Sequence, residues 1–225
     1  MELTAAAQWL NEFFGGFDHS ILQFYHNLAE VADPFVRPLM EFLSIIGDNG
    51  YFCFALALIL CLFKKTRRAG VTIVFAVGIG ALITNITLKE LIARPRPFVS
   101  EYTEWWHFVG APAEGEFSFP SGHVTAAMSG MTALSICFFR RFKWIVAPAA
   151  VYVILMGAAR NYLMVHYPSD VLAAMLVGAV AGTAAFFLIA FVFRFLEKHR
   201  NVRLFAFGLD FDLIDLFRKK KKTTE

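Results

Sequence analysis

Five long apolar stretches constrain this chain more than any other feature of its sequence. A helix needs about 20 residues to cross the hydrocarbon core of a bilayer, and residues 69–88 and 171–193 carry no charged side chain over such lengths. Residues 42–63, 124–139 and 144–159 are shorter or, in the first case, interrupted by polar residues. A soluble protein of 225 residues has too little amphipathic surface to cover five such stretches. They predict an all-α, polytopic membrane bundle of five transmembrane helices, or six if the N-terminus adds one.

The basic residues are distributed asymmetrically between the two ends of these spans. Most of the 21 Lys and Arg residues follow the first, third and fifth stretches, and an excess of such residues marks cytoplasmic loops. That side, which includes the C-terminus, is therefore predicted to be cytoplasmic. Lys89, Arg94, Arg96 and Arg160 lie at the opposite ends of the spans, where this rule gives no reason for them. They predict an active site at the outer membrane interface.

The two termini differ in composition from the apolar region between them. Residues 1–36 contain no Lys or Arg, which argues against a secretory signal peptide. Their aromatic residues, such as Trp9 and Phe13, predict an interfacial helix or, alternatively, an extra span. Residues 37–200 form the predicted transmembrane domain. Residues 201–225 alternate apolar and acidic residues and end in a lysine tract, which predicts a cytoplasmic, amphipathic, basic tail.

The first of three polar motifs follows the second apolar stretch. Lys89 and Arg96 are about two helical turns apart, so a helix would place them on the same face. Pro95 and Pro97 end that helix and hold the arginine in a turn. A single basic residue at this depth would be expected to extend toward the interface and serve no other role. Several basic residues together on the outer side predict a binding site for an anion.

The second motif, Pro120, Ser121, Gly122 and His123, precedes the third apolar stretch. Pro and Ser before an apolar run predict a helix start with Ser121 as its N-cap. The free N–H groups of such a helix end bind anions, and a glycine lets an anion approach the backbone. His123 is then placed to give a proton to a leaving group. The alternative is a capped helix with an interfacial histidine.

The third motif contains Arg160, His166 and Asp170. Pro168 predicts a new helix, which puts His166 in the turn before it and Asp170 in its first turn. A carboxylate at this spacing can bond one imidazole nitrogen, fix the tautomer and leave the other nitrogen free for nucleophilic attack. Polar groups at membrane depth are costly and usually functional, although a His–Asp pair can also be purely structural.

Taken together, the motifs predict one site for a tetrahedral oxyanion such as phosphate. Cationic side chains and a helix N-terminus bind such an anion, and two histidines flank it. The sequence has no carboxylate cluster suited to magnesium and no Cys/His set suited to zinc, so no metal or cofactor is expected. A phosphohistidine intermediate is the mechanism that these residues favour.

These residues resemble the pattern of the type 2 phosphatidic acid phosphatase superfamily over about residues 47–193. The family pattern is Lys, six residues, Arg-Pro; then Pro-Ser-Gly-His; then Ser-Arg, five residues, His, three residues, Asp. All three spacings match in order. One position departs from the pattern, because Ala159 stands where the family often has serine. The lost hydroxyl is expected to weaken phosphate binding by about tenfold at most.

The resemblance implies a role for each matched residue. His166 would be the nucleophile, Asp170 would orient it, and His123 would protonate the leaving oxygen and later activate water. The residues implied to hold the phosphate are Lys89, Arg96, Ser121, Gly122 and Arg160.

The resemblance also implies a substrate class. The chain is similar to bacterial undecaprenyl-diphosphate phosphatases, which implies a lipid phosphate or diphosphate as its substrate. The resemblance also implies membrane lipids as partners, no nucleic acid partner and a location in a bacterial plasma membrane. Phosphatidylglycerophosphate or phosphatidate are alternative substrates. A vanadate-dependent haloperoxidase would share the oxyanion site, but five membrane spans argue against it. A non-catalytic membrane binding or transport protein is the remaining alternative.

Overall fold

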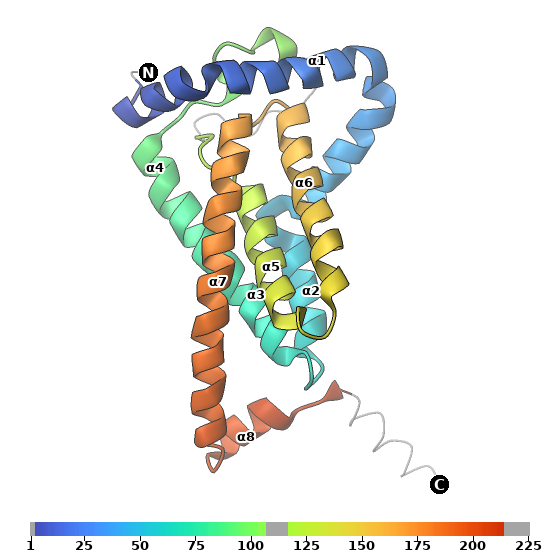
Figure 1. The fold of residues 1–225 in the computed structure, drawn as a ribbon, viewed down its shortest axis with the longest axis vertical. Coiled ribbons are helices and arrows are strands. Elements are labelled where there is room, and N and C mark those ends of the chain that lie inside the picture. Colours follow the sequence, from blue (N-terminus) through green and yellow to red (C-terminus); the bar gives the residue numbers. More distant parts are fainter. Residues whose placement is uncertain (1–2, 107–116, 214–225) are drawn as a thin grey trace.

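The chain folds into helices throughout the parts that the structure describes. The computed structural model describes residues 3–106 and 117–213, and these ranges contain no β-strand (Figure 1). The α-helices are α1 (Ala5–Gly47), α2 (Tyr51–Cys61), α3 (Arg67–Ala81), α4 (Lys89–Ile92), α5 (Gly122–Phe138), α6 (Val146–Tyr162), α7 (Pro168–Lys198) and α8 (Arg203–Asp210). A π-helical segment joins α3 to α4, and 3-10 turns lie at Asp48–Gly50, Pro97–Val99, Glu104–Trp106 and Lys143–Ile145. The predicted all-α class is confirmed.

The described helices form a bundle whose outer faces require lipid. Four segments are long and apolar enough to cross a membrane: Ala5–Cys61, Arg67–Val99, Lys143–Tyr162 and Pro168–Lys198. Helix α5 has 17 residues and packs among α3, α6 and α7 (Figure 1). Large apolar side chains cover the outside, and both Leu176 and Phe191 of α7 are 69% exposed. Exposure of so much apolar surface to water would be unfavourable, so this is an integral membrane bundle.

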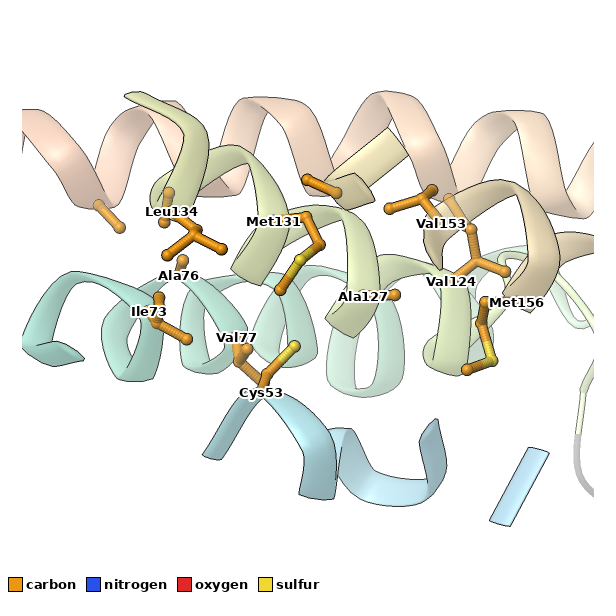
Figure 2. Close-up of a cluster of buried hydrophobic side chains, with 14 of the residues drawn as sticks. Cys53, Ile73, Ala76, Val77, Val124, Ala127, Met131, Leu134, Val153 and Met156 are labelled. Atoms are coloured by element: carbon orange, nitrogen blue, oxygen red, sulfur yellow. The ribbon is translucent and has the colours of Figure 1, made fainter. Parts of the chain in front are cut away.

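Helix α7 approaches α5 so closely that only glycine fits at two positions. A Cβ atom on Gly178 would lie 2.6 Å from the Cβ of Met128, and one on Gly182 would lie 2.7 Å from the Ser129 carbonyl oxygen. Small residues at such contacts are the usual way in which membrane helices pack. The buried side chains around this contact include Cys53, Ile73, Ala76, Val77, Val124, Ala127, Met131, Leu134, Val153 and Met156 (Figure 2). This apolar core holds in place the helices whose ends carry the polar motifs.

The first helix changes direction along its length. Its N-terminal half lies across one end of the bundle, and its C-terminal half runs down beside the other helices (Figure 1). Pro34 and Pro38 lie inside it, and proline removes a main-chain hydrogen bond and bends a helix. Trp9 of the crossing half is exposed, whereas Leu22 is fully buried. The location of residues 1–36 in the membrane interface stays a prediction.

Helix α8 packs at the opposite end of the bundle from this crossing helix (Figure 1). Lys64 Nζ lies 2.6 Å from Asp210 Oδ1, and Arg200 also pairs with Asp210. The hydrogen bond from Lys64, followed by that from Arg200, lowers the pKa of the Asp210 carboxyl. Of the predicted tail, residues 201–225, the lysine tract lies outside the described residues.

The α5–α7 contact predicts the effect of adding one methyl group. Replacing Gly182 by Ala forces a Cβ against the Ser129 carbonyl, and overpacking of this kind costs about 1–3 kcal/mol. The melting temperature of Gly182→Ala in detergent should therefore fall by several degrees. Gly16→Ala is the matched control, because nothing lies within 4 Å of the added Cβ in α1. Equal melting temperatures for the two variants would show that this helix contact is looser than the structure indicates.

Candidate active site

The three polar motifs meet at the end of the bundle that α1 crosses. A cavity of about 630 Å³ opens there. Six of the eight residues singled out from the sequence line it: Lys89, Arg96, Gly122, His123, Arg160 and His166. The other two, Ser121 and Asp170, are fully buried beside it. Segments far apart in the chain therefore combine at one place, as the motif spacing predicts.

The first motif reaches the site through the end of the long helix that begins with α3. The π-helical segment Leu82–Leu88 leads into α4, and Ala93 ends α4 in the left-handed region at φ 50°. The following turn buries Arg96, whose Nη1 donates to the Val165 carbonyl at 3.2 Å. Arg96 is thus fixed beside the segment that carries the nucleophile candidate. Asn85 of the π-helical segment also lines the cavity, a residue that the sequence analysis missed.

The second motif forms the N-terminus of α5, as expected, but its cap differs from the expectation. Ser121 occupies the N-cap position with extended dihedral angles, yet its side chain makes no capping hydrogen bond. Its main-chain N–H donates instead to the Asp170 carbonyl at 3.4 Å, which joins α5 to α7. A Cβ on Gly122 would lie 3.1 Å from Asn85 Oδ1, so glycine keeps the helix end open toward the cavity.

The His166 imidazole is held by a main-chain group that the sequence did not indicate. Its Nδ1 lies 2.7 Å from the Ser118 carbonyl oxygen, and Asp170 Oδ2 lies 3.7 Å from the same nitrogen. A carbonyl only accepts, so Nδ1 carries the proton and Nε2 is left for nucleophilic attack. The Asp170 carboxylate was expected to make this bond, but it accepts from the Tyr167 N–H and from Arg94. The distance of 3.7 Å is too long for a hydrogen bond.

The surroundings of His166 favour its neutral form. Burial, and then the positive charges of Arg96 and Arg160, lower the pKa of the His166 imidazole well below its ordinary value. A neutral imidazole has the lone pair that nucleophilic attack requires. The same cations that can attract an oxyanion thus favour an unprotonated His166.

Helix α1 and the turn after it each contribute one polar side chain that the sequence did not assign to the site. Arg160 Nη1 hydrogen-bonds to the Ser44 hydroxyl. His123 Nε2 lies 3.6 Å from Oδ1 of Asp48, a half-exposed residue in the turn after α1. The polar interruption of the first apolar stretch was the available signal for Asp48. Ala159, next to Arg160, packs into a buried apolar cluster with Leu43.

This arrangement can bind and cleave a phosphoryl group. Lys89, Arg96 and Arg160 supply positive charge, and the start of α5 supplies main-chain donors. Two imidazoles, on His123 and His166, face the same cavity. One can act as a nucleophile while the other transfers protons, and this arrangement suits displacement at phosphorus.

Comparison with known proteins identifies a family that matches this site. A model of the PAP2 superfamily matches residues 69–197. The undecaprenyl-diphosphatase BcrC of Bacillus subtilis is 34% identical over 73% of this chain and 80% of its own length. An undecaprenyl-diphosphatase of Sulfolobus acidocaldarius is 30% identical over 63% of this chain and 65% of its own length.

A solved structure agrees with these sequence matches. The crystal structure of a transmembrane PAP2-type phosphatidylglycerolphosphate phosphatase from Bacillus subtilis superposes with a TM-score of 0.62. It is 25% identical to this chain, and the match covers 86% of this chain and 91% of that one.

The open end of α5 predicts how substrate affinity depends on Gly122. A methyl group there would meet the Asn85 amide and block the approach of an anion to the helix N–H groups. Gly122→Ala should raise KM for a phosphorylated substrate by about tenfold, equivalent to about 1.4 kcal/mol of binding. Gly78→Ala is the control, because Gly78 lines the same cavity and nothing lies within 4 Å of its added Cβ. Equal KM values in steady-state phosphate release would contradict the assignment.

Proposed function

The chain belongs to the PAP2 superfamily, and we propose that it is a membrane phosphatase that hydrolyses a lipid phosphate or diphosphate, most specifically undecaprenyl diphosphate, through a phosphohistidine. The observation that carries this proposal is the mixed lining of the cavity. The lining includes the cations and histidines together with apolar residues such as Phe54, Val77 and Ala81 of α2 and α3. An amphiphile with a phosphorylated head group and a long hydrocarbon chain matches both kinds of residue.

The proposed first step is attack by His166 on phosphorus. Nε2 forms the N–P bond while the bond from phosphorus to the leaving oxygen breaks, and His123 gives that oxygen its proton. For a diphosphate, the leaving group is the lipid monophosphate. The phosphoryl oxygens are held by the side chains of Lys89, Arg96 and Arg160 and by the main-chain N–H group of Gly122. The Ser121 N–H, also expected from the sequence to bind phosphate, donates to the Asp170 carbonyl instead.

The proposed second step regenerates the enzyme. His123, now neutral, takes a proton from water as the water oxygen attacks phosphorus, and the N–P bond to His166 breaks. Inorganic phosphate leaves, and both imidazoles return to their starting state. Asp170 acts on this chemistry through the fixed turn that contains His166. We propose that Ala159 weakens phosphate binding without preventing either step.

The choice of lipid is the finer part of the proposal. The names of the two undecaprenyl-diphosphatase relatives support undecaprenyl diphosphate, and the solved structural relative supports phosphatidylglycerophosphate as a second candidate. The phosphate-binding residues do not distinguish these lipids, so the apolar part of the cavity must do so.

We also propose an orientation in a bacterial plasma membrane. The site lies at the end of the bundle crossed by α1, while Lys64 and Arg200 lie with α8 at the opposite end (Figure 1). Positive loops favour the cytoplasm. The site therefore faces outside, and the C-terminus faces the cytoplasm.

The central test is phosphate release by purified protein in detergent. Wild type should release phosphate from undecaprenyl diphosphate, and His166→Ala should lower kcat by at least about 10³-fold because the nucleophile is lost. His199→Ala, at the far end of α7, is the matched control and should keep full activity. Phosphatidylglycerophosphate and phosphatidate assayed in parallel rank the lipids. No release from any lipid by folded protein would favour a binding or transport protein instead.

A second test concerns metal dependence. Because cationic side chains supply the positive charge around the phosphate, EDTA should leave the rate of phosphate release unchanged. The measurement is an initial rate with and without EDTA after dialysis, with added Mg²⁺ as a further condition. A rate that EDTA abolishes and Mg²⁺ restores would overturn the metal-free mechanism.

A further inference from the structure

A buried ion triad lies directly behind the catalytic candidates. Arg94 Nη2 lies 2.8 Å from Asp18 Oδ2, and Arg94 Nη1 lies 2.7 Å from Asp170 Oδ1. The three side chains are only 2%, 1% and 0% exposed for Asp18, Arg94 and Asp170. Asp18 comes from the half of α1 that crosses the end of the bundle, Arg94 follows α4, and Asp170 lies in the first turn of α7. Burying these charges is costly unless each one is paired and hydrogen-bonded.

Ser169 completes the hydrogen bonding of the Asp18 carboxylate. Its main-chain N–H donates to Asp18 Oδ1 at 2.8 Å, and its hydroxyl donates to Asp18 Oδ2 at 2.7 Å. The same hydroxyl accepts from Arg94 Nη1 at 2.8 Å. Asp18 therefore binds the start of α7 through a main-chain group and a side chain, at a helix end where negative charge is favourable.

The remaining contacts of Arg94 leave its guanidinium a single orientation. Its Nε donates to Asn11 Oδ1 at 2.8 Å, and the guanidinium carbon stands 3.7 Å from the centre of the Tyr167 ring. Two partners, Asn11 and Asp18, come from α1. The crossing helix thus holds Arg94 from one side while α7 holds it from the other.

Arg94 in turn connects to both groups that surround His166. Its side chain binds Asp170, and its main-chain carbonyl accepts from the Ser118 N–H at 2.8 Å. The Ser118 carbonyl is the group bonded to Nδ1 of His166. A shift of Arg94 would therefore move the imidazole support on two sides.

We infer that Asp18 is a positioning residue for phosphoryl transfer, which makes the crossing half of α1 part of the catalytic apparatus. The inference rests on the proposed function for its kinetic consequence. Asp18 does not line the cavity that holds the phosphate-binding candidates, so it acts through Arg94 and Ser169 on the His166 turn. A role limited to anchoring α1 would affect folding but would leave the chemistry of folded enzyme unchanged.

The variant Asp18→Asn tests this inference with little change in shape. The amide keeps one oxygen for the Ser169 N–H but turns a donor toward Arg94, which also donates. In folded protein, kcat for phosphate release should fall by about 10- to 100-fold with KM within about twofold, because small displacements of a nucleophile slow chemistry by such factors. Asp18→Glu keeps the charge and should recover part of kcat.

Asp33→Asn provides the matched control on the same helix. Asp33 also ties α1 to the bundle, since it accepts hydrogen bonds from Arg37 and from the Tyr162 hydroxyl. It does not touch Arg94, Ser169 or Asp170. Its kcat should therefore equal that of wild type. Equal kcat values for Asp18→Asn and Asp33→Asn, both folded, would overturn the inference.

A substrate-free measurement separates this inference from the proposed function. In protein labelled with ¹⁵N-histidine, His166→Ala identifies the Nδ1–H signal of His166. That signal should shift or broaden in Asp18→Asn and stay unchanged in Asp33→Asn, whether or not any lipid is hydrolysed. Absence of phosphate release by wild type would contradict the proposed function alone. An unchanged His166 Nδ1–H signal in Asp18→Asn would contradict the positioning role.

Ser169→Ala keeps the test decisive if Asp18→Asn does not fold. It removes only the hydroxyl that joins Asp18 to Arg94 and leaves both ion pairs in place. A lower kcat with unchanged KM and a shifted His166 signal would support the positioning role. Wild-type values of both would overturn it.

Discussion

The ion triad of Asp18, Arg94 and Asp170 joins parts of the chain that otherwise share little contact. The bundle below it is held by apolar packing, which determines which helices are neighbours but places a polar side chain only loosely. Hydrogen bonds and ion pairs are directional, and at low dielectric their loss is costly. The triad can therefore fix the orientation of the turn that carries His166, which the apolar core alone does not.

The apolar core makes its own contribution through close backbone approach. Gly178 and Gly182 bring α7 against α5. The main-chain N–H of Ser121, at the start of α5, donates to the Asp170 carbonyl in the first turn of α7. This junction places the imidazoles of His123 and His166 on one cavity. The small residues deep in the bundle thus contribute to the geometry of the cavity at its end.

The cavity-lining residues were predictable because their chemistry is local in sequence. The uncharged spans predict the helical class. The expectation that one helix places Lys89 and Arg96 on the same face is wrong, because α4 ends at Ile92 and the turn that follows brings Arg96 to the cavity. Which end of a helix a motif occupies follows from proline positions. Apolar spans and proline positions can be recognised without knowing which segments meet in space.

The supporting residues were not predictable by the same reasoning. Ser118 acts through its carbonyl oxygen, which every residue has, so its side chain gives no signal. Asp18 and Ser44 reach the site from a helix far away in the sequence. One signal for Asp18 existed, because it falls on the stripe of α1 that also carries the buried residues Leu22 and Ala29. An acid on a buried stripe needs a partner, but the sequence does not say which cation supplies it.

The arginines at this end of the bundle divide into two groups by their contacts. Arg96 and Arg160 line the cavity, whereas Arg94 forms ion pairs with two carboxylates behind it. The triad holds two carboxylates and one guanidinium behind His166, whereas cations line the cavity in front of it. In the proposed mechanism, the imidazole gains positive charge as its nitrogen bonds to phosphorus, and the carboxylates behind it would stabilise that change. In that mechanism, the cations in front would favour the oxyanion and the triad behind would favour the cationic imidazole, so the two arginine groups would act on opposite ends of the forming N–P bond.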